Sequence, residues 1–182
     1  MLVDGKPFRT IWVGENGRTV EIIDQTRLPH EFITVGLETL DDAARAIADM
    51  LVRGAPLIGA TAAYGMALGV RGDATDSGLE NAYKVLYATR PTAVNLRWAL
   101  DDLRTLLSPL PASDREAAAY ARAAKIADED VDICSALGDH GKEIIERIWI
   151  DKGRPEQINV LTHCNAGWLA TVDWGTALAP IY

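Results

Sequence analysis

The middle of the chain has the apolar spacing of α-helices almost throughout. After Thr39, a predicted N-cap, apolar residues recur every three or four positions until about Trp149. Ala and Leu dominate the apolar residues and aromatic residues make up only 7% of the chain, so a mostly helical fold is expected. Glycine and proline divide this region into five predicted helices, at 40–51, 56–70, 79–88, 95–107 and 113–149, the last of them long or broken. Ser113 to Glu116 has the form of a capping box at the start of this last helix, and the glycines at 138 and 141 within it indicate close helix packing.

Both flanks of this helical region have the patterns of β-strands instead. At the N-terminal end, Thr10–Val13 and 18–24 predict strands joined by a tight Asn16-Gly17 turn, and 31–35 predicts a third strand. These segments indicate a small antiparallel sheet.

At the other end, residues 158–164 are apolar and β-branched, as in a buried parallel strand. A glycine turn follows, and a further helix is predicted to begin by Asp173. This order is the opening of an open α/β sheet. The predicted fold is therefore α/β overall, with an N-terminal α+β domain at 1–130 and, at 131–182, a linking helix and the start of a parallel-sheet domain that this chain does not complete. The acidic stretch 128–132 is the predicted hinge or boundary.

Charge and cysteine content limit the classes of function. A net charge of −8 argues against a nucleic-acid-binding face. Cys134 and Cys164 are the only cysteines, and we expect free thiols in a reducing cytoplasm. The weakly polar run 55–70 is too short to cross a bilayer comfortably, so no membrane association is expected. His30 and His140 have no ligand-spaced partners, and no cofactor-binding glycine motif is present, so neither a metal nor a cofactor is predicted.

Cys164 is the first candidate for chemistry. It ends the predicted parallel strand, where open α/β sheets bind ligands, and a following helix N-terminus would favour its thiolate. A buried core cysteine is the alternative interpretation. Neighbouring His163 would point to the opposite face of a regular strand, so a direct Cys–His pair is expected only if the strand ends at Thr162.

Two arginines adjoin predicted helix starts and are candidates for binding an anion. Arg53 precedes Gly54, Ala55 and a proline that begins a helix, so its guanidinium would lie beside free backbone N–H groups, as in a phosphate site. Arg90 lies ahead of a rigid turn and the next helix. The alternatives are an ordinary glycine stop followed by a proline start, and a solvated arginine beside an N-cap at Asn95.

Four segments of the chain, in order, together resemble methylthioribose-1-phosphate isomerases. The resemblance is carried by Ile23-Asp-Gln-Thr-Arg-Leu-Pro29, Arg53-Gly-Ala-Pro-Leu-Ile-Gly59 with Ala62-Ala-Tyr-Gly65, Arg90-Pro-Thr-Ala-Val-Asn95, and Leu161-Thr-His-Cys-Asn-Ala-Gly167 with Leu169-Ala-Thr171 and Gly175-Thr-Ala-Leu178. The same superfamily includes ribose-1,5-bisphosphate isomerases and regulatory subunits of the eukaryotic translation initiation exchange factor. The resemblance implies a small N-terminal domain followed by a Rossmann-like domain through which the protein forms a homodimer.

The resemblance also implies a reaction and a set of site residues. The implied enzyme is an intramolecular oxidoreductase of methionine salvage that converts 5-methylthioribose 1-phosphate into 5-methylthioribulose 1-phosphate. Cys164 matches the catalytic cysteine, whereas Arg53, Gly54, Ala55 and Arg90 match residues that bind the phosphorylated sugar. The second catalytic group, an aspartate, belongs to the other half of the Rossmann-like domain, so residues 1–182 alone are expected to be inactive.

Departures from the family pattern leave two alternatives open. Trp168 stands where a small residue is usual, and Asp173-Trp174 replaces a common Gly-Tyr, so the substituent at C5 of the sugar is in question. Another 1-phosphorylated pentose, such as ribose 1,5-bisphosphate or 5-deoxyribose 1-phosphate, is the first alternative. A non-catalytic regulatory subunit is the second, although such subunits generally lack the Cys164 motif.

Overall fold

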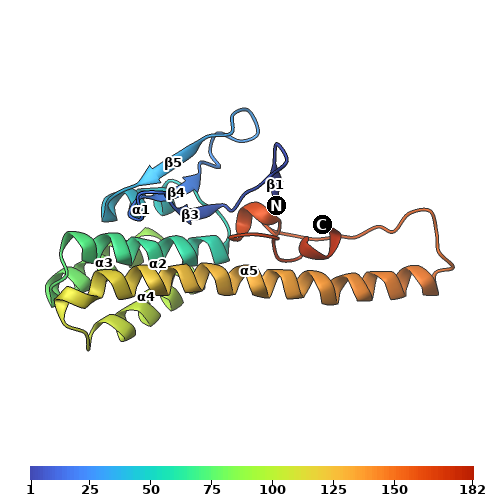
Figure 1. Cartoon of the computed structure of the whole chain (residues 1–182). Coiled ribbons are helices and arrows are strands. Elements are labelled where there is room, and N and C mark those ends of the chain that lie inside the picture. The colour runs from blue at the N-terminus through green and yellow to red at the C-terminus, as the bar shows by residue number, and fades with distance from the viewer.

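The computed structural model describes residues 1–182, and it consists of two small antiparallel sheets, five α-helices and two short 3₁₀ turns. Strands β1 (Leu2–Val3) and β2 (Lys6–Pro7) form a hairpin that the sequence analysis did not predict. The second sheet has the order β3 (Ile11–Val13), β4 (Val20–Ile23), β5 (Thr34–Leu37). Figure 1 shows this sheet lying over the helices, with α5 running along the whole length of the molecule.

The predicted hairpin between β3 and β4 is confirmed. The Asn16 side-chain oxygen accepts the backbone N–H groups of Arg18 and Thr19, each at 2.9 Å, and Gly17 supplies the positive φ of +68° that the turn requires. Strand β5 begins three residues later than predicted, because Glu31 is still bonded into a turn through its N–H to the Arg27 carbonyl.

The five helices of the middle region form close to their predicted positions. Helix α1 (Leu40–Ala48) is capped by Thr39, whose hydroxyl accepts the Asp42 N–H while the Asp42 carboxylate accepts the Thr39 N–H. Helix α2 (Ala55–Gly72) is buried along most of its length and contacts all four other helices, so it forms the centre of the hydrophobic core. No helix of the protein combines the length and apolarity needed to cross a membrane.

Two predicted N-caps are wrong. Helix α3 (Asp76–Thr89) is followed by α4 (Val94–Leu107), which begins after Ala93, so Asn95 lies inside α4 and does not cap it. Helix α5 (Ala112–Asp151) begins directly after Pro111, one residue earlier than predicted. The Ser113 hydroxyl therefore donates to Asp114, and the capping box expected at Ser113 is not formed.

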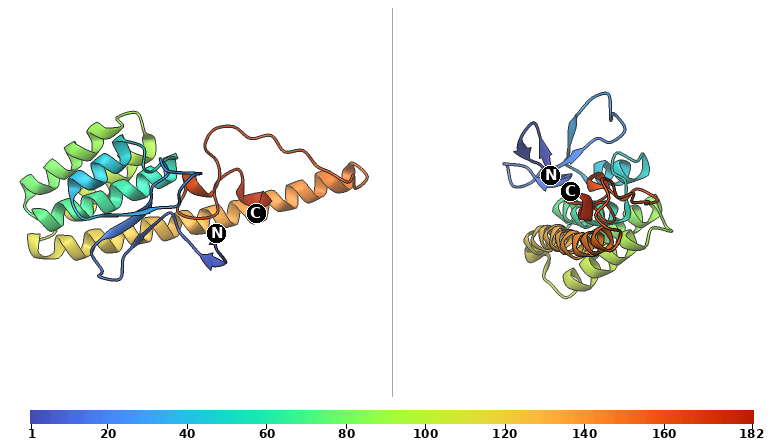
Figure 2. Two further views of the ribbon diagram at one scale, coloured as in Figure 1. Left: turned by 90° about the horizontal axis from the view of Figure 1, so that it is seen from above. Right: turned by 90° about the vertical axis from the view of Figure 1, so that its right-hand side faces the viewer.

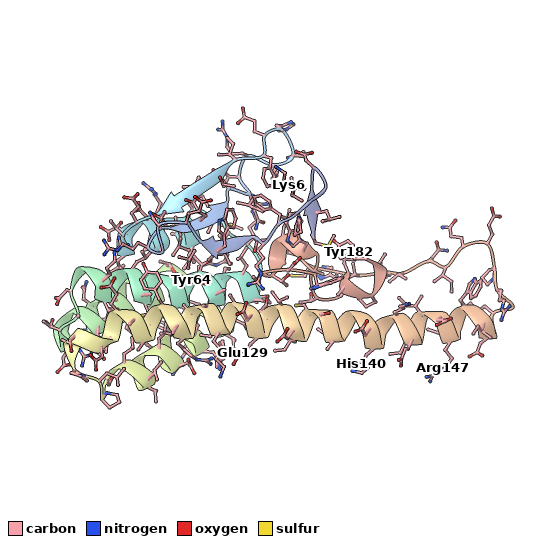
Figure 3. All side chains as sticks on the ribbon, in the orientation of Figure 1. Lys6, Tyr64, Glu129, His140, Arg147 and Tyr182 are labelled. Carbon is pink, nitrogen blue, oxygen red and sulfur yellow. The ribbon has the colours of Figure 1, made fainter.

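Helix α5 is a single uninterrupted helix and crosses the acidic stretch 128–132 without a break. Its first part packs against α2 and α4, whereas its second part extends beyond the helical core (Figure 2). Figure 3 shows His140 and Arg147 on this extension, with side chains directed away from the rest of the chain. Because a continuous helix can also link two domains, the division at 130/131 stays a prediction.

The strand predicted at 158–164 is not formed, and neither is the helix predicted to begin by Asp173. A strand forms only beside another strand that pairs with its backbone groups, and no other strand of this chain lies beside this segment. Leu161 is accordingly 98% exposed. The chain instead ends in two 3₁₀ turns, η1 (Trp168–Ala170) and η2 (Ala179–Ile181).

The chain folds back so that turn η1 packs against α2 and turn η2 packs against α5. The close packing predicted at Gly138 and Gly141 is present, but its partner is the turn η2, since a Cβ at Gly141 would overlap the Pro180 ring. In Figure 1 the turns η1 and η2 lie between the N-terminal strands and helix α5. This docking brings the 163–166 segment close to the start of α2.

Candidate active site

A cavity of about 1180 Å³ lies where the start of α2, the α3–α4 connection and the C-terminal segment meet. It is lined by the five residues that the sequence analysis singled out, namely Arg53, Gly54, Ala55, Arg90 and Cys164. These residues come from three stretches of the chain that are far apart in sequence. The fold therefore brings the candidate residues into one site, while their individual roles stay predictions.

One wall of the cavity is the phosphate turn, by which we mean residues Arg53–Pro56 at the start of α2. Gly54 occupies the N-cap position with φ +88°, no side chain caps the helix, and its first turn contains no acidic residue. Pro56 has no N–H, so the N–H groups of Ala55 and Leu57 are the free donors of this helix end. A free, uncapped helix N-terminus attracts anions through these donors and the helix dipole.

The arginines add positive charge to the same wall. Arg53 is exposed, and its Nε lies 3.5 Å from the Met50 carbonyl oxygen, which leaves its terminal nitrogens available. Arg90 is the C-cap of α3 and is half-buried. The ion pairs of this chain that involve arginine are made by other arginines, so neither guanidinium is neutralised by a carboxylate.

The lining of the cavity contains no aspartate or glutamate. This is notable in a protein with a net charge of −8, because acidic residues outnumber basic ones by 26 to 18 in the sequence. Two unpaired guanidinium groups and a helix N-terminus without any nearby carboxylate form a region of positive potential on an acidic protein. The cavity is therefore suited to bind an anion such as a phosphate monoester.

The opposite wall is the thiol turn, residues His163–Ala166. Cys164 is exposed and has φ +71°, a conformation that is uncommon for a residue with a side chain. The following turn η1 is a single turn of three residues, so the helix N-terminus expected to favour the Cys164 thiolate is absent from this structure. His163 also lines the cavity, but no hydrogen bond joins it to Cys164.

Long-range hydrogen bonds hold the C-terminal segment against the rest of the molecule. Thr10 bonds to this segment through its backbone and its side chain. Its N–H donates to the Val172 carbonyl at 3.0 Å, and its hydroxyl donates to the carbonyls of Thr171 and Val172. The Val172 N–H donates to the partly buried carboxylate of Asp130 at 2.7 Å. Burial raises the pKa of Asp130 above its usual range, although this hydrogen bond opposes the rise.

The second cysteine lies outside the cavity. Cys134 is buried on α5 beside Asp130, and burial together with that carboxylate raises the pKa of its thiol to about 12. A thiol with such a high pKa is inert at neutral pH. Of the two cysteines, only Cys164 therefore faces solvent and the cavity.

Other lining residues were not predicted as site residues from the sequence. Gln25, the most buried polar one, donates its side-chain amide to the Leu169 carbonyl at 2.6 Å. Its only signal in the sequence is its place in the 23–29 segment that carries the resemblance. Apolar side chains form much of the remaining wall, namely Leu28, Met50, Ile58, Val94 and Leu169.

Comparison with curated proteins aligns the whole of this chain with methylthioribose-1-phosphate isomerases. The chain is 66% identical over 182 residues to a methylthioribose-1-phosphate isomerase of Paramagnetospirillum magneticum, and 56% identical to one of Escherichia coli O45:K1. All of this chain is aligned in both cases, against 50% and 49% of the relatives. The chain thus spans about half the length of the curated relatives it matches.

Solved structures with the same fold belong to proteins of two different functions. The 5-methylthioribose 1-phosphate isomerase of Pyrococcus horikoshii OT3 superposes with a TM-score of 0.80 at 38% identity, over 96% of this chain and 48% of that one. The delta subunit of translation initiation factor eIF-2B from A. fulgidus gives 0.79 at 34% identity, over 96% and 50%. The fold alone does not separate these functions.

A family assignment follows from the sequence itself. The pattern of the initiation factor 2 subunit family matches residues 51–179, which is well over half of the chain and includes Arg53, Arg90 and Cys164. The chain belongs to the initiation factor 2 subunit family.

Proposed function

We propose that the protein carrying this chain is an aldose–ketose isomerase that converts 5-methylthioribose 1-phosphate into 5-methylthioribulose 1-phosphate. The observation that carries the proposal is one cavity lined by Cys164, two unpaired arginines and a free helix N-terminus, with no carboxylate in the lining. The identity of 66% to a methylthioribose-1-phosphate isomerase supports it. Because this chain spans half of that relative, the proposal concerns the full-length protein.

The reaction explains why such a cavity would be needed. Phosphate on the anomeric oxygen prevents simple opening of the sugar ring to a free aldehyde, so the ring must open with the phosphate attached. The ring oxygen gains a proton as its bond to C1 breaks, the C2 hydroxyl loses a proton, and one hydrogen moves from C2 to C1. Atoms and charge are then balanced, and acid–base groups in a site shielded from water suffice as catalysts.

In this proposal each group of the cavity has one task. Arg53, Arg90 and the N–H groups at the start of α2 bind the phosphate. Cys164 exchanges a proton with the sugar from the opposite wall. The second acid–base group is the aspartate that the resemblance implies, in the part of the protein that corresponds to the other half of the relatives. The lining of this chain itself contains no carboxyl group.

The same cavity favours a sugar with an apolar substituent at C5. One phosphate is matched by the two arginines and the helix end, whereas a second phosphate would require further cationic groups from the half of the protein outside this chain. Leu28, Met50 and Leu169 instead offer an apolar surface that suits a methylthio group. A regulatory subunit of the same fold is the second candidate, favoured by the TM-score of 0.79 to the eIF-2B subunit, but it gives no role to Cys164.

The proposal is tested by assaying the full-length protein with 5-methylthioribose 1-phosphate and, in parallel, with ribose 1,5-bisphosphate. We expect turnover of the first and a much lower kcat/KM for the second. A preference for ribose 1,5-bisphosphate would make that sugar the substrate in place of 5-methylthioribose 1-phosphate. No turnover of either sugar would favour the regulatory subunit. Substrate with deuterium at C2 separates two routes, since wash-out of the label into solvent contradicts a direct hydride shift.

A further inference from the structure

Gln25 lies buried at the junction of the two walls of the candidate site. It follows β4 by two residues, its side chain lines the cavity, and it is only 6% exposed. Burial of an amide is costly unless the amide is hydrogen-bonded. The bonds that Gln25 makes therefore indicate what it holds in place.

Its hydrogen bonds reach both walls. The backbone N–H of Gln25 donates to the Leu51 carbonyl at 2.9 Å, two residues before Arg53 of the phosphate turn. The side-chain Nε2 donates to the Leu169 carbonyl at 2.6 Å, five residues after Cys164. One residue is thus bonded to the segments that lead into the phosphate turn and out of the thiol turn.

The bond to Leu169 is transmitted to the thiol turn through a short, internally bonded segment. Leu169 is the middle residue of η1, where the Ala170 N–H donates to the Gly167 carbonyl at 3.0 Å. The Ala166 carbonyl accepts the Thr176 N–H at 2.9 Å. Cys164 is two residues ahead of Ala166 and makes no hydrogen bond that would fix it independently. Its position therefore depends on how the 166–170 segment is anchored.

We propose that Gln25 is a positioning residue whose side-chain amide holds the thiol turn at a fixed distance from the phosphate turn. This inference rests on the proposed isomerase function. With the phosphate bound at Arg53 and Arg90, the amide keeps Cys164 over the sugar. Displacement of a reacting group by about 1 Å can lower a rate on the order of 10²-fold.

The two hydrogen bonds of Gln25 predict a specific kinetic signature. The bond to Leu51 uses the backbone, so every substitution at position 25 except proline keeps it, and the phosphate turn stays in place. The bond to Leu169 uses the side chain and is lost when the amide is removed. Loss of the amide is therefore expected to lower kcat and to leave KM nearly unchanged.

The experiment uses the full-length protein with Gln25→Met, which keeps the length of the side chain but cannot donate. Gln157→Met is the matched control, because Gln157 is exposed and outside the cavity. We expect kcat of Gln25→Met to fall roughly 10- to 100-fold with KM within about twofold, and the control to keep both values. An unchanged kcat contradicts the proposal, as does a rise in KM alone, which would make Gln25 a direct ligand of the substrate.

A second variant, Gln25→Glu, tests the hydrogen bond itself and covers poor folding of the methionine variant. Its carboxylate cannot donate to Leu169, whereas its protonated form can. The ratio of its kcat to that of the parent is expected to rise as the pH is lowered, while the ratio for Gln25→Met stays flat. The other ionisable side chains of the cavity, Arg53, Arg90, His163 and Cys164, are present in every variant, so the parent and Gln25→Met measured at each pH serve as references. A flat ratio for Gln25→Glu contradicts the assigned bond.

Amide hydrogen exchange tests the positioning independently of catalysis. The N–H groups of Ala170 and Thr171 are hydrogen-bonded within the η1 turn. Because Gln25→Met removes the bond that anchors this turn, exchange of these two amides is expected to accelerate by about tenfold or more. Helices α1 to α4 should exchange as in the parent. Unchanged exchange at these two amides overturns the proposal. This measurement does not require isomerase activity, so failure of the inference can be distinguished from failure of the proposed function.

Discussion

Gly54 lies directly against Ala170, so that the start of α2 and the turn η1 touch through their backbones. A Cβ at position 54 would overlap the carbonyl oxygen, the Cα and the Cβ of Ala170. Gly54 also has φ +88°, a region in which side chains are strained. This one contact joins the phosphate turn to the segment that carries the thiol turn, and it explains why a residue without a side chain is needed there.

Replacing Gly54 by alanine is expected to destabilise the protein by about 1–3 kcal/mol or more, because the overlap with Ala170 adds to the strain at positive φ. Chemical denaturation measures the change. Gly72→Ala is the control, since nothing lies within 4 Å of a Cβ there and φ is not positive. The control should differ from the parent by less than about 1 kcal/mol. Equal stability of the two variants would mean that Gly54 and Ala170 are not in contact.

Arg90 is expected to contribute to phosphate binding. In Arg90→Met the cavity keeps its shape but loses one of its two guanidinium groups, and a hydrogen bond to a charged group contributes about 1.5–3 kcal/mol. Binding of 5-methylthioribose 1-phosphate to the full-length protein, measured by calorimetry, should weaken by roughly 10- to 150-fold. Arg97→Met is the control, because Arg97 lies outside the cavity and pairs with Asp101. Similar affinities of both variants would remove Arg90 from the site.

The two cysteines are expected to react very differently with an alkylating reagent. Cys164 is exposed, whereas Cys134 is buried and the pKa of its thiol is raised to about 12. Iodoacetamide at pH 8, followed by peptide mass spectrometry, should label Cys164 alone in the native protein and both cysteines after denaturation. Labelling of Cys134 at a comparable rate in the native protein would contradict its burial beside Asp130.

The partly buried carboxyl of Asp130 predicts a pH-dependent difference in stability between the parent and a neutral variant. Its raised pKa means that the native state binds the proton of this carboxyl more tightly than the unfolded state does. The stabilisation from the protonated carboxyl is therefore complete below 3.8, the pKa in the unfolded state, and is lost as the pH rises through the pKa in the native state. Asp130→Asn is always neutral and keeps an oxygen for the Val172 N–H. The variant should be more stable than the parent at pH 7, by a margin that shrinks toward pH 4.

Urea unfolding at several pH values measures this margin. Asp132→Asn provides the control, because Asp132 is an exposed neighbour on the same helix and its substitution should change stability by less than about 0.5 kcal/mol. A parent that is more stable than Asp130→Asn at pH 7 would show that the charged hydrogen bond to Val172 outweighs the cost of burial.

The sequence predicted those features of the fold that are determined locally. Thr39 and Asp42 are three residues apart and cap α1 by themselves, and the Asn16-Gly17 turn likewise needs no distant partner. The strand at 158–164 was predicted from an apolar, β-branched pattern, but a strand forms only where neighbours complete its hydrogen bonds. In this chain Leu161 remains exposed, and the segment is not a strand.

For the candidate site, too, the sequence predicted what is determined locally and not what depends on distant contacts. Arg53, Arg90 and Cys164 could be selected from the sequence because each adjoins a turn or a helix end and each falls in a segment of the resemblance. Gln25 could not be selected, since its partner Leu169 is 144 residues away and no local pattern marks the bond between them. The absence of carboxylates from the cavity is likewise visible only in three dimensions.

The most direct test of the central claim compares Cys164→Ser with Cys134→Ser in the full-length protein, by turnover of 5-methylthioribose 1-phosphate. If Cys164 exchanges a proton with the sugar, its substitution should lower kcat on the order of 10²–10⁴-fold, and the same change at buried Cys134 should leave kcat within a few-fold of the parent. Full activity of Cys164→Ser would contradict the account and remove the thiol from the mechanism.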